Sequence, residues 1–205
     1  MDAAGRLESS RGAAPSGLVS YAYYPAGNVS SVVSVAGTTK YAKDAADRVT
    51  GIDGPTADAS ITYNSENGLI DTLAYSNGVT ATYSWDILDR LTGIRWVKGT
   101  SELRRLDYSY SPANLITGIV REAGRKIGYR YDDLDRLTFE RLTLQYGGTG
   151  YEAEYGYDLA GNRTSKRRDG VNVSYTNAVG NKLVGWSVTG AVGSLTVPVT
   201  GHSSE

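Results

Sequence analysis

The nine residues YRYDDLDRL, numbers 129–137, recur at residues 83–91 as YSWDILDRL. A truncated copy occupies residues 1–7, and weaker full copies begin at Tyr21, Tyr41, Ile61, Tyr108, Tyr155 and Tyr175. The last position of the pattern recurs every 20 to 26 residues, at Leu7, Val29, Val49, Leu69, Leu91, Ile116, Leu137, Arg163 and Leu183. Self-similarity at such a period is typical of repeat proteins.

The seventh position of the repeat is restricted to three residue types. It is Gly, Asn or Asp in all nine copies, although these types make up under a quarter of the chain. The nine residues are Gly5, Gly27, Asp47, Asn67, Asp89, Asn114, Asp135, Gly161 and Asn181. These residue types tolerate a left-handed backbone better than others do. We therefore expect one left-handed turn residue in each repeat.

The fourth position carries side chains that can accept hydrogen bonds from nearby backbone amides. Seven copies have Asp2, Asp44, Asn64, Asp86, Ser111, Asp132 or Asp158, and the exceptions are Tyr24 and Ala178. Together with the seventh position, this predicts a type I turn closed by a left-handed residue, a common loop of β-hairpins.

The residues that enter each turn alternate between apolar and polar. Examples are the apolar series Leu106, Tyr108, Tyr110 and Ile127, Tyr129, Tyr131. A period of two indicates antiparallel strands that are half-buried on one face. A second turn between repeats is indicated by Asn77-Gly78, Lys98-Gly99, Gly147-Gly148 and Asp169-Gly170. The predicted fold class is all-β, an antiparallel β-hairpin repeat array.

Composition and charge narrow the range of partners. The chain has 205 residues, a net charge of −1, 16 Tyr against 1 Phe, and no Cys. A balanced charge provides no overall field to attract nucleic acid. No apolar run is long enough to span a membrane, and the absence of Cys excludes disulfides and thiolate metal sites. We expect no nucleic-acid partner, no membrane span and no cofactor.

The repeat resembles the Tyr-x-Tyr-Asp-x-x-Gly-Arg-Leu signature of YD repeats, found in bacterial Rhs proteins, in the C components of insecticidal Tc toxins, and in teneurins. Residues 129–137 match it at every position but the seventh, where Asp135 replaces Gly, and YGYDLAGNR at residues 155–163 is a common variant. The resemblance runs from residue 1 to about residue 185. Nine copies in one frame make the pattern highly specific.

The resemblance implies a fold and a place in a larger protein. In this family the strands spiral into a hollow shell, which in toxin members encloses a C-terminal effector. Such a shell generally needs more than nine repeats, and Met1 stands at the third position of a copy, so residues 1–185 are expected to be a segment of one. Residues 186–205 lose the repeat and are expected to open a following β-sandwich domain.

The resemblance also implies a location and partners. We expect an extracellular or cell-surface protein whose partners are the flanking YD repeats and a C-terminal effector or sandwich domain of the same parent protein. The leading hypothesis is a non-catalytic structural segment of a shell that encloses or displays a toxin or adhesion module. The alternative is a cell-surface carbohydrate-binding or adhesion module.

Catalysis is the least favoured hypothesis. The pairs Asp86/Asp89 and Asp132/Asp135 have the composition of an acid–base dyad or a calcium site. Turn chemistry is favoured, because sister repeats carry Gly or Asn at these positions. The sequence has no Asp-Pro, and therefore lacks the Asp-Pro-x-Gly-Leu self-cleavage motif of toxin-bearing members.

Two other catalytic patterns are incomplete. The single histidine, His202, has only Glu205 as a nearby acidic residue, which disfavours a triad. Residues 147–150, Gly-Gly-Thr-Gly, lack the Gly-Lys-Ser/Thr of a phosphate-binding loop. No catalytic, cofactor-binding or metal-binding residue is predicted.

Arginines and tyrosines of the repeat are the candidate ligand contacts. Arg6, Arg48, Arg90 and Arg136 recur at the eighth position. They could form a basic ladder that faces a glycan or an acidic partner, but pairing of each guanidinium with its own turn's Asp or a neighbour's carbonyl is favoured. Exposed tyrosines could stack on sugar rings, although packing on the sheet is favoured. The residues proposed for glycan contact are Arg90, Arg136, Tyr131 and Tyr157.

Overall fold

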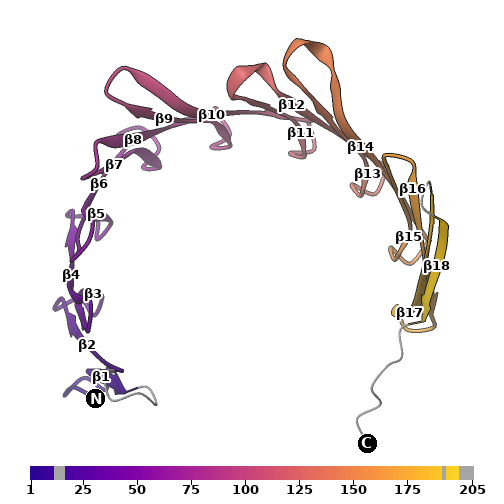
Figure 1. Ribbon diagram of the computed structural model, residues 1–205. Coiled ribbons are helices and arrows are strands. Elements are labelled where there is room, and N and C mark those ends of the chain that lie inside the picture. Colours follow the sequence, from indigo (N-terminus) through magenta and orange to yellow (C-terminus); the bar gives the residue numbers. More distant parts are fainter. Residues whose placement is uncertain (12–16, 191–192, 199–205) are drawn as a thin grey trace, which may run out of the picture. The chain divides into compact units, whose positions relative to one another are not determined.

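The computed structural model describes residues 1–11, 17–190 and 193–198, the last segment by its backbone alone. These residues form 18 strands and two short 3₁₀ elements (Figure 1). The chain divides into two compact units, residues 1–105 and residues 106–205. Each unit is a sheet of antiparallel strands, so the predicted all-β hairpin array is confirmed.

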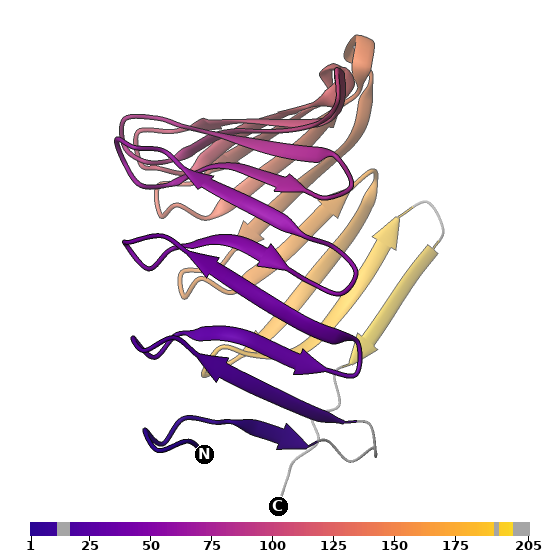
Figure 2. The same cartoon turned by 90° about the vertical axis from the view of Figure 1, so that its left-hand side faces the viewer.

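In the first unit each strand pairs with the next one along the chain, from β1 to β9. Figure 2 shows strands of this unit side by side in chain order, with turns at both ends. Its strands are β1 (Ser9–Arg11), β2 (Leu18–Tyr23), β3 (Val29–Ser34), β4 (Gly37–Lys43), β5 (Val49–Asp53), β6 (Ala59–Tyr63), β7 (Ile70–Tyr75), β8 (Val79–Trp85) and β9 (Leu91–Lys98).

Strand β10 (Ser101–Tyr110) begins in the first unit and ends in the second. The second unit continues the same order of pairing, from β10 to β18. Its further elements are β11 (Ile116–Arg121), η1 (Glu122–Gly124), β12 (Lys126–Tyr131), β13 (Leu137–Thr143), η2 (Gln145–Gly147), β14 (Thr149–Tyr157), β15 (Arg163–Arg168), β16 (Val171–Ala178), β17 (Lys182–Gly190) and β18 (Gly193–Pro198).

A β-bulge lies at the same place in all eight complete copies of the repeat. The register of the two strands shifts between the second and third positions, for example between Arg130 and Tyr131 and between Ser84 and Trp85. A type I turn followed by a left-handed residue produces such a bulge, because it places one extra residue in one strand. The turn residues therefore set the register of every repeat hairpin.

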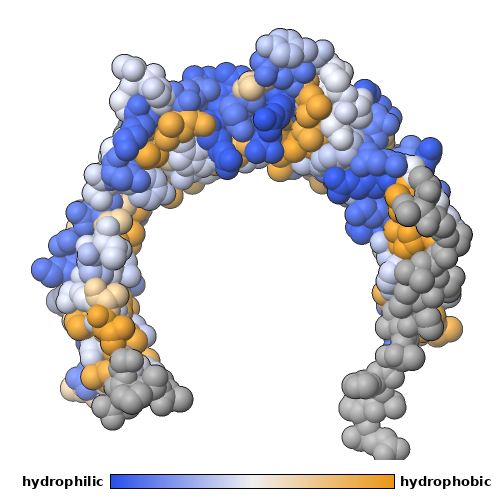
Figure 3. Space-filling view, in the orientation of Figure 1, coloured by the Kyte–Doolittle hydropathy of each residue, from blue (hydrophilic) through white to orange (hydrophobic). Residues whose placement is uncertain are grey.

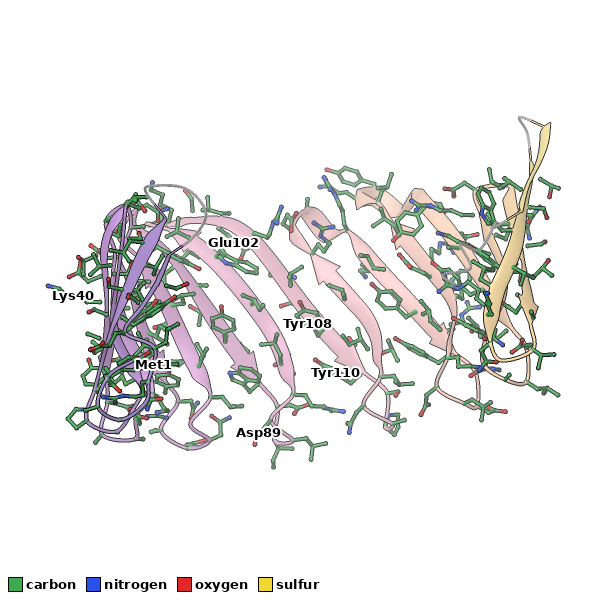
Figure 4. All side chains as sticks on the ribbon, turned by 90° about the horizontal axis from the view of Figure 1, so that it is seen from below. Met1, Lys40, Asp89, Glu102, Tyr108 and Tyr110 are labelled. Carbon is green, nitrogen blue, oxygen red and sulfur yellow. The ribbon has the colours of Figure 1, made fainter. Side chains whose placement is uncertain are left out.

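The second turns between repeats use other geometries. Asp169 and Gly170 both have positive φ, 50° and 84°, as a type I′ hairpin turn requires. In η1 and η2, Ala123 and Tyr146 also have positive φ, and each precedes a glycine with positive φ. These turns lie at the strand ends opposite the repeat turns. Figure 4 shows this for the first unit, where Asp89 and Glu102 lie at opposite strand ends.

Apolar side chains are mostly half-buried. Among the described residues, the only fully buried apolar side chains are those of Ala81 and Ala153, at 0% and 1% exposure. Figure 3 shows apolar residues as separate patches between hydrophilic ones. A repeat in such a sheet is stabilised mainly by contact with the neighbouring repeats.

The predicted domain boundary at residues 185/186 falls inside β17. Strand β17 pairs with β16 on one side and with β18 on the other. The division into repeats (1–185) and a tail that opens a sandwich domain (186–205) stays a prediction.

Candidate functional site: the joint between repeats

The seventh position of the repeat has a left-handed backbone in eight of the nine copies. The φ angles include 60° at Asp135, 58° at Asp89 and 85° at Gly161. Positive φ is also found at Gly5, Gly27, Asp47, Asn114 and Asn181. The Asp135 N–H donates to the Asp132 carbonyl at 3.0 Å, and the Asp132 N–H donates to the Arg136 carbonyl at 3.0 Å. The left-handed residue thus returns the chain to the sheet.

Asn67 is the exception, and the expectation of a left-handed backbone there is wrong. Gly68 has the positive φ instead, at 72°. This turn is one residue longer, because the Asn64 N–H donates to the Leu69 carbonyl and the Gly68 N–H to the Asn64 carbonyl. The extra residue moves the left-handed position to the glycine, which has no Cβ to strain. The Asn67 amide Nδ2 instead donates to Asp89 Oδ1 at 3.1 Å.

The fourth-position side chain organises the inside of each turn. Asp132 Oδ1 accepts hydrogen bonds from the backbone N–H groups of Leu134 and Arg136, both at 3.0 Å. The same two bonds, from residues two and four positions on, are made by Asp2, Asp44, Asp86, Ser111 and Asp158. In the longer turn, Asn64 Oδ1 accepts from Glu66 and Asn67.

These bonds favour the ionised carboxylate. The hydrogen bond from the Arg136 backbone N–H has the largest effect on Asp132 and lowers its pKa. Desolvation comes second and raises the pKa, but the bonds from the Arg136 guanidinium and the Leu134 N–H lower it further, so the pKa is lowered overall. The Arg48 N–H and guanidinium likewise lower the pKa of Asp44. At Asp86 burial is the largest single influence and raises the pKa, but the bonds from Arg90 outweigh it, so the pKa is lowered.

The eighth-position arginine links its own turn to the next repeat. Arg136 Nε donates to Asp132 Oδ2 at 2.7 Å, and its Nη1 donates to the carbonyl of Asp158 in the next turn at 2.8 Å. Its guanidinium carbon lies 5.0 Å from the centre of the Tyr157 ring. One side chain therefore holds a carboxylate, a carbonyl and an aromatic ring from two successive repeats.

The same linkage recurs in the first unit. Arg48 donates to Asp44, to the Gly68 carbonyl at 3.2 Å, and lies over the Tyr63 ring at 4.2 Å. Arg6 donates to Asp2 and to the Tyr24 carbonyl at 3.3 Å, and lies over Tyr23 at 4.5 Å. Arg90 Nε donates to Asp86 Oδ2 at 2.7 Å. Each of these arginines therefore pairs with the Asp of its own turn, which is the arrangement that the sequence favoured.

The third-position side chain makes a bond in the opposite direction, to the preceding repeat. Tyr157 Oη donates to the Leu137 carbonyl at 2.9 Å, and Tyr131 Oη to the Ile116 carbonyl at 2.8 Å. Equivalent bonds run from Tyr23 to Leu7, Tyr63 to Val49, Trp85 to Ile70 and Asn177 to Arg163. Sequence reasoning missed these bonds. The sequence feature that could have indicated them is the preference for Tyr or Trp at the third position. These residues carry a hydrogen-bond donor, whereas Phe would pack equally well without one.

We call the set of third-, fourth- and eighth-position contacts the repeat joint. Of the residues proposed for glycan contact, Arg136 and Tyr157 meet in one joint, and Tyr131 and Arg90 lie in others. Glycan contact by these four residues stays a prediction.

A second cluster lies on the tyrosine-bearing face of the second unit. Tyr151 and Tyr155 both donate to Glu140, the latter at 3.4 Å. Arg168 lies 4.3 Å from the centre of the Tyr151 ring, and Arg163 4.8 Å from that of Tyr155. Burial, followed by the bond to Glu140, raises the pKa of Tyr151 to about 12. Sequence reasoning missed this cluster, because it depends on the cross-strand register of β13 and β14.

The Asp side chains considered for an acid–base dyad or a calcium site lie in the repeat turns. The Asp86 and Asp132 carboxylates are occupied by N–H and guanidinium donors. Within the described residues there is no group of three or more His, Cys, Asp or Glu side chains that could hold a metal ion. His202 and Glu205 lie outside the described residues. No helix in the described part is long and apolar enough to cross a membrane.

Comparison with known proteins shows a likeness in fold. Three solved structures of similar fold are TcdB2-TccC3-TEV, a Photorhabdus luminescens Tc holotoxin pore with a TccC3 mutation, and TcdB2-TccC3 without its hypervariable C-terminal region. Their TM-scores are 0.64, 0.56 and 0.55, their identities 16%, 17% and 13%, and they match 78%, 88% and 84% of this chain. The matched region is 10%, 9% and 13% of those chains. No family model and no curated protein matches the sequence.

Proposed function

We propose that this chain is a non-catalytic segment of wall in a YD/Rhs-repeat shell that encloses or displays a toxin or adhesion module. The observation that carries the proposal is the repeat joint. In it, the most characteristic polar side chains of one repeat bind the backbone and the aromatic ring of the next, as Arg136 does with Asp158 and Tyr157. Side chains that hold successive repeats together have a structural role, and their polar groups are already bonded within the protein rather than open to a substrate.

The likeness to chains of Tc toxin structures supports a toxin-associated wall. This chain spans about a tenth of the length of those chains. Its place in a whole shell is therefore part of the proposal. The proposed partners are flanking repeats and a C-terminal effector or sandwich domain of the same parent protein. The proposed location is extracellular or at the cell surface.

The test is protection of the parent protein's C-terminal module from protease. In the intact parent the enclosed module should resist a protease that digests the same module expressed alone. The double substitution R48A/R136A, which opens two repeat joints, should increase its digestion. If the module is digested equally fast alone and within the intact parent protein, the shell does not enclose it, and the display role would be favoured. A minor β content by circular dichroism would contradict the wall itself.

The alternative, a cell-surface carbohydrate-binding module, is favoured by one observation. The Tyr146 side chain at the tip of η2 is 96% exposed, so its ring is open for stacking on a sugar. A glycan array with the folded chain tests this alternative. Uniformly negative binding, or binding that is unchanged by Y146A and by R90A/R136A, would count against it.

A further inference from the structure

The second unit carries a groove of about 480 Å³ on the sheet face that bears Gly118, Gly128 and Arg141. Its floor is the cross-strand pair Gly118 and Gly128, on β11 and β12. Its walls include Lys126, Arg130, Phe139 and Arg141. The groove shares no side chain with the repeat joints.

The two floor glycines are required neither by the backbone nor by packing. Neither has a positive φ. A Cβ added to Gly128 would meet nothing within 4 Å, and one added to Gly118 would come no closer than 3.6 Å to another atom. At Gly156, by contrast, a Cβ would lie 2.5 Å from Ser165 Oγ. Glycine weakens a strand, and in a strand interior it often marks the close approach of a ligand or of another backbone.

The groove has two positive charges available for a ligand. Lys126 and Arg130 are exposed and stand at the two sides of Gly128 on β12. In the described part of the chain neither side chain forms an ion pair, and the Arg130 guanidinium lies 4.6 Å from the centre of the Phe139 ring. The third cation, Arg141, is held by Glu152 at 3.2 Å. Asp107 lies on the same face, two strands from Lys126.

We propose that this groove binds an extended acidic peptide that runs along β12. Lys126 and Arg130 are four residues apart, which separates their Cα atoms by about 13 Å in a strand. An extended peptide has the same rise per residue, so two carboxylates four residues apart match the two cations. A small residue midway between them lies over Gly128. A polysaccharide fits less well, because Arg130 already covers the Phe139 ring on which a sugar would stack.

The experiment uses the whole chain and a labelled peptide, acetyl-Thr-Glu-Thr-Gly-Thr-Glu-Thr-amide. Fluorescence anisotropy at low salt should show saturable binding that weakens as salt is added. A peptide of the same composition with its two Glu adjacent should bind about tenfold more weakly, since its carboxylates point to opposite faces. The peptide with Gln in place of both Glu should show no binding.

Two variants separate binding from folding. K126E/R130E should abolish binding, whereas the control K98E/R104E, which changes two exposed cations of the first unit, should leave it unchanged. G128V should also abolish binding by filling the groove, and it should raise the thermal midpoint, because Val favours a strand more than Gly does.

Several outcomes would overturn the proposal. These are absence of binding by the folded chain, equal binding of the adjacent-Glu peptide, and binding that survives K126E/R130E or G128V. A fourth is binding of heparin fragments, dependent on Lys126 and Arg130, without binding of the peptide. That result would make the groove a polysaccharide site.

Discussion

The Arg136 guanidinium lies 5.0 Å from the centre of the Tyr157 ring, although the two residues belong to different repeats. Tyr157 in turn donates to the Leu137 carbonyl, next to Arg136 in the chain. Two successive repeats are thus held by contacts that run in both directions. The strength of these contacts can be measured on the isolated chain.

Replacing Arg136 tests the forward contact. R136A should lower the free energy of unfolding by about 1 kcal/mol or more, because it removes the cation–π contact with Tyr157 and the charge-assisted bonds to the Asp158 carbonyl and the Asp132 carboxylate. R136K keeps the charge but not the planar fork, and should fall between R136A and the unchanged protein. Urea denaturation followed by circular dichroism measures both. Equal stability of R136K and the unchanged protein would show that charge alone is responsible.

Replacing Tyr157 by Phe tests the backward contact. Y157F keeps the ring beneath Arg136 and loses only the bond to the Leu137 carbonyl, so it should cost about 1 kcal/mol. Y146F is the matched control, because the Tyr146 side chain is 96% exposed, and it should cost close to nothing. The comparison of the two urea midpoints gives the value of one such bond. If both variants have the same stability, the hydroxyl bond contributes nothing.

The turn carboxylates make stability depend on acid. The folded chain lowers the pKa of Asp2, Asp44 and Asp132 below the ordinary value of 3.8. A lowered pKa stabilises the folded state at pH values above the ordinary pKa, and this stabilisation is lost as the pH falls through the folded values. The urea midpoint should therefore fall as the pH is lowered from about 5 to about 2.

D132N is the control for this acid dependence. It keeps an Oδ1 acceptor, as Asn64 does in its own turn, but it has no charge to titrate. Its stability should be lower than that of the unchanged chain at neutral pH and should change less in acid. An undiminished acid dependence in D132N would assign the effect to other groups.

Tyr151 makes stability depend on alkali. Its pKa is raised from 10.0 to about 12 by burial and by the bond to Glu140. The folded state therefore favours the neutral phenol, and this stabilisation is complete below pH 10 and lost as the pH rises to about 12. The pKa values of Tyr83, Tyr108, Tyr129, Tyr131 and Tyr155 are raised as well, so phenolate absorbance should show a group of late-titrating tyrosines, from which Y151F removes the one that titrates near pH 12. E140Q should bring the pKa of Tyr151 closer to its ordinary value.

The longer turn that begins at Asn64 can be tested for which of its residues has the left-handed backbone. G68A should cost about 1 kcal/mol, because Gly68 has the left-handed φ of 72° that a Cβ disfavours. N67A should cost less, since Asn67 does not have a left-handed backbone. Thermal unfolding of both variants measures the order. A larger loss in N67A than in G68A would place the left-handed residue at position 67.

The sequence by itself determined the local structure of this protein. Alternating side chains defined the strands, and the Gly, Asn or Asp at the seventh position placed the turns, because backbone preference and period-two burial act within a few residues. The sequence was insufficient at Asn67, where one additional residue moved the left-handed position to Gly68.

Only the tertiary structure decided which repeats touch and through which atoms. The bond from Tyr157 to the Leu137 carbonyl and the Glu140 cluster with Tyr151 depend on the register of one strand against another. So does the glycine floor of Gly118 and Gly128, which are ten residues apart in the chain and paired in the sheet. The physical reason is that register follows from the bulge and turn lengths of every hairpin together, and a single repeat does not contain that information.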